Sequence, residues 1–230
     1  MTISVIIPTL NEHNVLAKTL THTASLGLDE IIVVDGGSTD LTVPTAQAFC
    51  TTTPDTHLIT APRGRARQMN EGAKASRGDV LLFLHADTQL PEDTGRLIES
   101  AFIDPTVVGG RFDVRFGSSS LWSRVISSFM NRRSRLTGIS TGDQTLFVRR
   151  QVFERLGGFL EIPLMEDIDF SRRLKRAGRV AALRNTVTTS FRRWETQGPL
   201  RTILLMWTLR FLYWTGVSPH RLHRFYAAIR

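Results

Sequence analysis

Residues 79–88 read Asp-Val-Leu-Leu-Phe-Leu-His-Ala-Asp-Thr. A run of apolar, strand-favouring residues that ends abruptly in polar ones is typical of a strand buried on both faces of a parallel sheet. His85 and Asp87 would then follow the carboxyl end of this strand, at the edge where open α/β sheets bind ligands. Because carboxylate oxygens suit Mg²⁺ or Mn²⁺, which can in turn hold a diphosphate, Asp87 is a candidate metal ligand.

Strands and helices alternate before this central stretch. Strands are expected at 3–8, 30–34 and 57–60, and helices at 11–25, 41–49 and 64–75. This order predicts an α/β fold with a mostly parallel sheet and helices on both faces. A length of 230 residues with 41% hydrophobic residues is compatible with one domain.

The turn at 35–40 reads Asp-Gly-Gly-Ser-Thr-Asp. Its glycines allow the backbone to approach a ligand, and Asp35 could accept hydrogen bonds from a nucleotide base or ribose. The alternative is that Asp35 caps the turn. The first loop, 8–12, contains no glycine, which disfavours a nicotinamide dinucleotide site and also a nucleotidyltransferase.

Several motifs in this order resemble the inverting glycosyltransferases of family 2, which have the GT-A fold. The matching segments are 4–12, 31–40, 64–72, 82–88, 156–159 and 165–170. The resemblance implies a GT-A domain over 1–195, with a nucleotide-binding half at 1–90 and an acceptor half at 91–195. Residues 196–230 would form a basic and apolar helical extension.

The resemblance also implies roles for individual residues. Residues expected to bind the nucleotide sugar are Thr9, Glu12, Asp35, Arg63, Asn70, His85 and Asp87, with Asp87 also binding Mg²⁺ or Mn²⁺. Residues expected to contact the acceptor or the diphosphate are Asp143, Gln144, Arg193 and Trp194. Asp167 is the expected catalytic base, with Glu166 as its neighbour; the alternative is that both acids merely stabilise a helix N-terminus.

His85 departs from the family pattern, because an Asp is expected at this position of the Asp-x-Asp motif. The alternative for His85 is a strand-end residue bonded to a neighbouring carbonyl. The resemblance implies transfer of one sugar, with inversion, from a UDP- or GDP-sugar, and the basic, apolar C-terminal quarter indicates a lipid or lipid-linked acceptor. The competing hypothesis, suggested by His85, is a GT-A-like nucleotide- or glycolipid-binding protein without turnover.

Residues 107–149 predict the elements of the acceptor half. Alternating apolar and polar residues at 107–116 predict a half-exposed strand. An amphipathic helix with a basic end is expected at 121–135, and another strand at 144–149. The segment 142–144 is expected to form a loop over the sugar. The Gln that leads the Arg-Trp element of processive synthases is missing before Arg193, which favours transfer of a single sugar.

Charge is distributed unevenly along the chain. Residues 1–170 carry 16 Lys and Arg against 20 Asp and Glu, whereas residues 171–230 carry 13 against one. This asymmetry indicates a polyanionic partner, and nucleic acid would not explain the acidic site, so an anionic membrane surface is expected. The single Cys50 and the absence of a signal-like start predict a cytoplasmic protein.

Residues 200–214 are apolar on nearly every side, and a basic aromatic helix is expected at 220–230. A transmembrane helix needs about 20 apolar residues, which is more than this run provides. We therefore expect peripheral contact with the cytoplasmic face of the inner membrane through these helices. The alternative is a terminal helix that covers the core or a partner in a homodimer.

Overall fold

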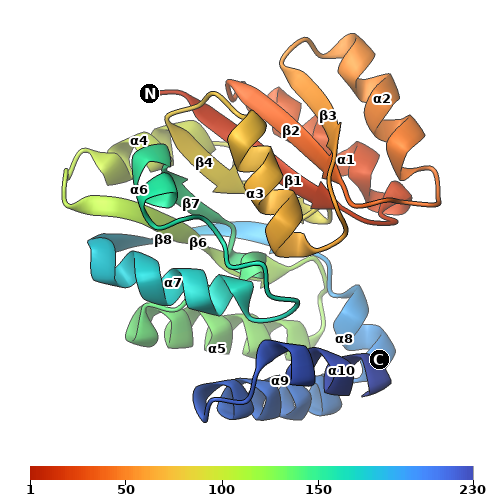
Figure 1. Cartoon of the computed structure of the whole chain (residues 1–230), viewed down its shortest axis with the longest axis vertical. Helices are drawn as coiled ribbons and strands as arrows, with labels where there is room; N and C mark the ends of the chain where they lie inside the picture. Colours follow the sequence, from red (N-terminus) through yellow and green to blue (C-terminus); the bar gives the residue numbers. More distant parts are fainter. Residues whose placement is uncertain (230) are drawn as a thin grey trace.

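The computed structural model describes residues 1–229, with side chains described as far as Tyr226 (Figure 1). Its strands are β1 (Ile3–Thr9), β2 (Glu30–Asp35), β3 (Thr56–Thr60), β4 (Val80–Phe83), β5 (Thr88–Gln89), β6 (Val107–Phe116), β7 (Leu146–Arg149) and β8 (Arg179–Thr189). The first five helices are α1 (His13–Ser25), α2 (Thr42–Thr52), α3 (Arg65–Ala75), α4 (Thr94–Phe102) and α5 (Leu121–Thr137). After the 3₁₀ turn η1 (Gly142–Gln144) come α6 (Arg150–Arg155), α7 (Glu166–Ala177), α8 (Arg192–Gln197), α9 (Pro199–Trp214) and α10 (Pro219–Ile229).

The described strands form one mixed sheet in the order β3-β2-β1-β4-β7-β6-β8-β5. The neighbouring pairs among β3, β2, β1 and β4 are parallel, which confirms the alternating strands and helices predicted for the first 90 residues. β7 is antiparallel to both β4 and β6 and joins the two predicted halves within one sheet. The fold is thus α/β with a mostly parallel sheet, as predicted.

The two faces of the sheet are covered by different helices. Along β1, Val5 and Ile7 belong to one buried cluster and Ile6 to another, because successive side chains point to opposite faces. The first cluster includes residues of α1, α4 and α5, and the second includes residues of α3, α6 and α7. Because helices cover both faces of the sheet, the side chains on both faces of the central strand β4 are apolar.

The prediction that 107–116 is half-exposed is wrong. β6 lies between β7 and β8, and α5 packs against it, so seven of its ten residues are buried and only Arg115 is exposed. The polar residues that suggested exposure are paired inside the protein: Arg111, only 2% exposed, forms an ion pair with Asp113, which also accepts a hydrogen bond from Arg135. A buried charge is tolerated when it is paired in this way.

The C-terminal helices pack on the acceptor half. Leu209 of α9 and Leu222 of α10 are buried with Met165 and Ile168 at the start of α7. The predicted helix at 220–230 is confirmed to residue 229, and residue 230 lies outside the described residues. Within the described chain, no helix combines the length and the apolar character needed to span a bilayer.

Gly72 allows α3 to pack tightly against the sheet. A methyl group in its place would collide with Ile6 and lie 2.9 Å from Cγ2 of Val34. Overpacking costs about 1–3 kcal/mol, more than the gain of about 1 kcal/mol in helix propensity. We expect Gly72→Ala to lower the melting temperature by a few degrees, whereas Gly95→Ala, whose new Cβ would lie 3.6 Å from its nearest neighbour, should not. A melting temperature of Gly72→Ala equal to that of the unmodified protein would contradict this packing.

Candidate active site

His85 connects the end of β4 to the acceptor half. Its Nδ1 lies 3.3 Å from Oδ1 of Asp143 in η1, so the alternative of a bond to a neighbouring carbonyl is wrong. Burial alone would raise the pKa of Asp143, but the hydrogen bond with His85 and the charges of His85, Arg65 and Arg193 lower this pKa to about 2. The carboxylate of Asp143 is therefore ionised at neutral pH and fixed at the centre of the site.

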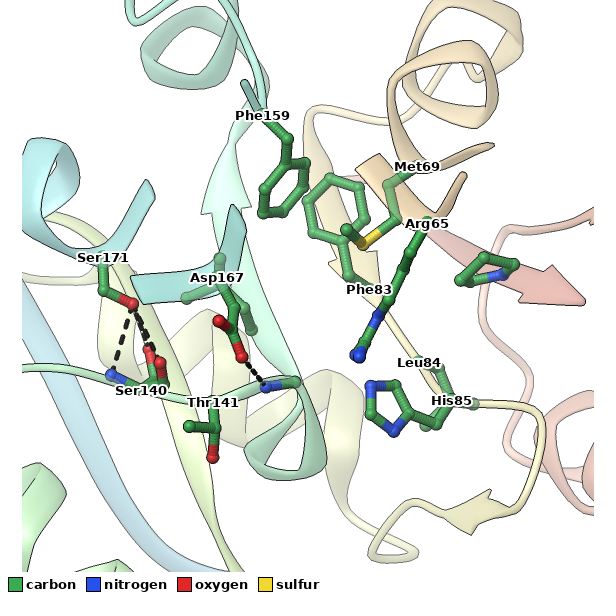
Figure 2. Close-up of a pocket in the computed structure, with 13 residues that line it drawn as sticks. Arg65, Met69, Phe83, Leu84, His85, Ser140, Thr141, Phe159, Asp167 and Ser171 are labelled. Atoms are coloured by element: carbon green, nitrogen blue, oxygen red, sulfur yellow. Dashed lines mark hydrogen bonds between the residues drawn. The ribbon is translucent and has the colours of Figure 1, made fainter. Parts of the chain in front are cut away.

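The turn η1 also positions the predicted base. The backbone N–H of Gly142 donates to Oδ2 of Asp167 at 2.9 Å (Figure 2). The other carboxylate oxygen accepts from the N–H of Ile168 at 2.7 Å. A side chain at Gly142 would collide with the guanidinium of Arg65 and the imidazole of His85. Glycine at this position allows these groups to lie against the turn.

Glu166 lies behind Asp167, at the first position of α7. Its side chain is almost fully buried, and its Oε1 lies 3.6 Å from Nε of Arg65. Burial and the neighbouring charge of Asp167 raise the pKa of Glu166, and the positive charges of Arg65 and His85 oppose this increase. Asp167, rather than Glu166, lines the pocket that also contains Arg65 and His85.

The arginine of this pocket is Arg65, not Arg63. Arg63 is exposed before the start of α3, whereas the guanidinium of Arg65 points toward His85 (Figure 2). Helical spacing could have identified it, because Arg65 lies three and four residues before the buried Gln68 and Met69. Arg63 was the residue expected to bind the nucleotide sugar, whereas Arg65 lines the pocket.

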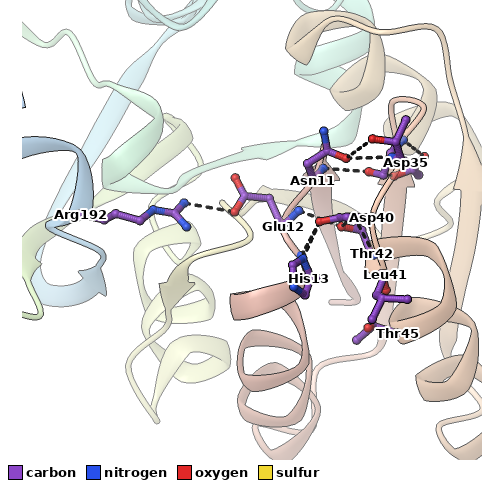
Figure 3. A network of polar contacts seen from close by, with 11 residues as sticks. Asn11, Glu12, His13, Asp35, Asp40, Leu41, Thr42, Thr45 and Arg192 are labelled. Carbon is purple, nitrogen blue, oxygen red and sulfur yellow. Dashed lines mark hydrogen bonds and ion pairs between the residues drawn. The ribbon is translucent and has the colours of Figure 1, made fainter. Parts of the chain in front are cut away.

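Hydrogen bonds join the first loop to the turn after β2 (Figure 3). Asn11 accepts from the N–H of Thr39, and His13 lies 2.7 Å from Asp40. Asp35 is 2% exposed and accepts hydrogen bonds from the N–H of Gly37 and from both the N–H and the hydroxyl of Ser38. In this structure Asp35 caps the turn, which is the alternative that the sequence left open.

Glu12 forms a contact between distant parts of the chain. Its Oε2 lies 3.3 Å from Nη2 of Arg192 in α8 (Figure 3). Burial raises the pKa of Glu12; the hydrogen bond and charge of Arg192 lower it, and the charge of Asp87 raises it. Glu12 and Asp87 are therefore close enough for their charges to interact, so the first loop borders the end of the central strand.

Two residues predicted to bind the nucleotide sugar serve the fold in this structure. Thr9 is buried, and its hydroxyl donates to the carbonyl of Val34. Asn70 uses both ends of its amide on the backbone of Phe159, donating to the carbonyl at 2.8 Å and accepting from the N–H at 2.9 Å. Asn70 therefore holds the loop before α7 rather than facing a ligand.

Of two residues predicted to contact the acceptor, Gln144 is internal and Trp194 is half-buried. Gln144 is fully buried and forms a capping box with Thr141 inside η1. Trp194 packs on Phe116, with ring centroids 6.0 Å apart, and is stacked with Phe191. These side chains support the walls of the site, because burial of their polar or aromatic groups stabilises the local fold.

Arg193 of α8 lies at the border between the site and the C-terminal helices. Its guanidinium lies 5.2 Å from the ring centroid of Tyr226, and its side chain is exposed. Its positive charge is one of those that lower the pKa of Asp143. Arg193 is therefore within electrostatic reach of the site without a direct bond to Asp143.

Asp87 is suited to a divalent cation as a single carboxylate ligand. Its Oδ1 is 3.4 Å from the hydroxyls of Thr88 and Thr189, and among the described residues it forms no ion pair. The described part of the chain holds no group of three His, Cys, Asp or Glu arranged for a metal. Mg²⁺ is commonly bound by one or two carboxylates together with substrate phosphates, and the residues present fit that arrangement.

Comparison with known proteins identifies a family and a fold. The model of glycosyl transferase family 2 matches residues 4–157. A PGL/p-HBAD biosynthesis glycosyltransferase of Mycobacterium bovis is 33% identical over 74% of this chain and 68% of that protein. An undecaprenyl-phosphate 4-deoxy-4-formamido-L-arabinose transferase of Pseudomonas paraeruginosa is 33% identical over 64% of this chain, which spans 46% of that protein.

A similar solved structure is a mannosyltransferase of Pyrobaculum calidifontis in complex with GDP-Man and Mn²⁺. It has a TM-score of 0.66 and 23% identity, and the alignment covers 82% of this chain and 56% of that one. At this identity the likeness concerns the fold alone, and it confirms the GT-A architecture predicted from the sequence motifs.

Proposed function

The chain belongs to glycosyl transferase family 2, and from this membership we propose that it transfers one sugar from a UDP- or GDP-sugar, with inversion, to a lipid or lipid-linked acceptor. The observation that carries the proposal is the connection made by η1. Gly142 bonds Asp167 at 2.9 Å, and the adjacent Asp143 contacts His85 at 3.3 Å. One short turn thus fixes the candidate base relative to the end of the donor-side strand.

In the proposed reaction, Asp167 accepts the proton of the acceptor's hydroxyl as that oxygen attacks the anomeric carbon. The bond from this carbon to the diphosphate breaks, and its electron pair leaves with the nucleoside diphosphate. The backbone N–H groups of Gly142 and Ile168 orient the carboxylate of Asp167. Arg65, which faces His85 across the turn, contributes positive charge on the side where the diphosphate departs.

Asp87 would hold Mg²⁺ or Mn²⁺ in this proposal, with His85 and Glu12 nearby. A bound divalent cation would supply positive charge that stabilises the leaving diphosphate. The relative solved with GDP-Man and Mn²⁺ supports this assignment by its fold. His85, held by Asp143, replaces the usual first carboxylate and reduces the negative charge beside the sugar.

Thermal denaturation with and without Mn²⁺ tests the donor class. A ligand at about 100 times its dissociation constant stabilises a protein by about 2.7 kcal/mol, which corresponds to several degrees for a chain of this size. We expect such a rise with UDP or GDP only when Mn²⁺ is present. If neither UDP nor GDP raises the melting temperature in the presence of Mn²⁺, the proposed class of donor is refuted.

The C-terminal helices support peripheral contact with the cytoplasmic face of the inner membrane. The exposed side of α9 carries Leu200, Leu204, Trp207, Phe211 and Trp214. This surface continues onto α5, where Phe129 stacks on Trp207 with ring centroids 5.6 Å apart. Exposed Arg124, Arg132 and Arg201 lie on the same two helices, and each basic residue near an anionic surface contributes about 1 kcal/mol.

Flotation with liposomes tests this contact. We expect binding to require anionic lipid, to weaken at high salt, and to fall when Trp207 and Trp214 are both replaced by Ser, because apolar insertion and charge attraction act together. Ile103→Ser is the matched control, since Ile103 is 80% exposed between α4 and β6, away from α9. Protein that stays unbound at low salt with anionic vesicles would exclude the membrane role.

A further inference from the structure

Arg133 of α5 is half-buried beside the active site, and two of its guanidinium nitrogens have no hydrogen-bond partner among the described residues. Its Nε and Nη2 are completely buried, and within the described residues no hydrogen-bond acceptor reaches either atom. Buried guanidinium groups are ordinarily paired, because removing an ionised group from water is costly unless an opposite charge or acceptor replaces the water. The orphaned donors of Arg133 therefore indicate an acceptor that is supplied from outside the chain.

A second arginine, Arg210 of α9, lies close to Arg133. The helices meet where Phe129 stacks on Trp207, and each arginine follows its aromatic residue by one helical turn. Burial and then the positive charge of Arg210 lower the pKa of Arg133 to about 10. The guanidinium group of Arg133 is therefore charged at neutral pH, and its repulsion by the positive charge of Arg210 is relieved when an anion lies between the two groups.

The carboxylates of the active site lie near both arginines but are already engaged. The negative charges of Asp167 and Asp143 raise the pKa of each arginine, although burial lowers it. Asp167 accepts from Gly142 and Ile168, and no ion pair joins either carboxylate to Arg133 or Arg210 in the part of the chain that the structure describes. The site thus contains two guanidinium groups that form no ion pair with a carboxylate of the described residues.

These arginines come from other elements than the residues assigned to the donor's diphosphate. The candidate diphosphate site is bordered by Asp87 and His85 after β4, whereas Arg133 and Arg210 come from α5 and α9 in the acceptor half and the extension. The same two helices carry the exposed apolar surface described above. A ligand with an anionic head between the arginines could therefore extend its apolar part along these helices.

We propose that Arg133 and Arg210 together bind the phosphate group of a phosphorylated lipid acceptor, next to Asp167. The planar guanidinium forms paired hydrogen bonds with phosphate oxygens, so two such groups can hold one phosphate in a fixed orientation. This inference rests on the proposed function, because it assigns the chemical class of the acceptor.

Equilibrium binding of geranyl phosphate, geraniol and inorganic phosphate to the full chain tests the proposal. We expect geranyl phosphate to bind and geraniol to bind at least about tenfold more weakly, since charge-assisted hydrogen bonds are lost. Arg133→Gln and Arg210→Gln should each weaken geranyl phosphate binding about tenfold or more. Arg155→Gln on α6 and Arg176→Gln on α7, both exposed and outside the surface formed by α5 and α9, are the matched controls and should bind normally.

Thermal denaturation without ligand distinguishes a binding role from a structural one. Because Arg133 and Arg210 repel each other and neither forms an ion pair with another described residue, each Gln variant should melt at or above the temperature of the unmodified protein. A large decrease in melting temperature for both variants, or geranyl phosphate binding unaffected by both, would overturn the proposal. Inorganic phosphate that binds as tightly as geranyl phosphate would support the phosphate site and assign it to a soluble phosphate ester.

Binding of UDP and GDP with Mn²⁺, measured on the same samples, separates this inference from the proposed function. Nucleotide binding without arginine-dependent phosphate binding would refute the acceptor assignment and leave the transferase proposal intact. Phosphate binding without nucleotide binding would refute the proposed donor and leave the arginine site as a phosphate-binding site.

Discussion

Asp167→Asn is expected to reduce sugar transfer by about 10²-fold or more while leaving nucleotide binding unchanged. The amide has nearly the same shape as the carboxylate but cannot accept the proton of the attacking hydroxyl. Its oxygen can still accept the 2.9 Å hydrogen bond from Gly142, so the turn η1 should keep its conformation. The measurement is single-turnover transfer, with donor affinity determined by calorimetry.

Glu166→Gln is the informative comparison for this variant. Glu166 is almost fully buried, and Arg65 lies 3.6 Å from its carboxylate, so its loss should disturb the position of Arg65 and give a milder decrease. Transfer by Asp167→Asn near the normal rate would refute its role as base and direct attention to Glu166 or Asp143. Complete loss of nucleotide binding in Asp167→Asn would instead indicate a disturbed fold.

Asp87→Asn is expected to remove the gain in nucleotide affinity that Mn²⁺ or Mg²⁺ provides, a decrease of at least about tenfold. An amide oxygen is a much weaker ligand for a hard divalent cation than a carboxylate. Among the described residues, the Asp87 side chain accepts only two long hydrogen bonds, from hydroxyls at 3.4 Å, so the fold should tolerate the change. Calorimetric titration of UDP and GDP with and without metal measures the effect.

Asp93→Asn is the control for this second prediction. Asp93 follows Asp87 closely in the sequence, is exposed, and pairs with Arg96 at the start of α4. It should retain the full metal-dependent gain. Equal metal-dependent affinity in Asp87→Asn and the unmodified protein would refute the assignment of Asp87 as the ligand.

The parts of the fold that depend on local pattern could be predicted from the sequence. The central strand and its neighbours have continuous apolar runs, and their parallel pairing follows from the alternation with helices. The burial of 107–116 could not be predicted in this way, because the polar Arg111 and Asp113 neutralise each other inside the sheet. The ion pair between these two residues is not visible as a sequence pattern. Their alternation with apolar residues therefore suggested exposure although the strand is mostly buried.

The same limit applies to the candidate site. His85, Asp87 and Asp167 follow strand ends or begin helices, so their positions can be inferred from local structure. The hydrogen bonds of Asn70 to the backbone of Phe159 could not be predicted, because the two residues are 89 positions apart. Motif resemblance gives residue types at given positions, whereas the direction of each side chain depends on contacts between distant segments.

The place of β7 in the sheet has a consequence for how the chain folds. β4 pairs with β1 on one side, but its other edge is covered only by β7, whose residues lie more than 60 positions later in the sequence. Pairings of such long range form slowly, and an uncovered strand edge can join the edge of another molecule. During synthesis, an apolar β4 therefore remains open until residues 146–149 have emerged. We expect chains that stop before β7 to aggregate, and the full-length protein to refold in better yield at low concentration.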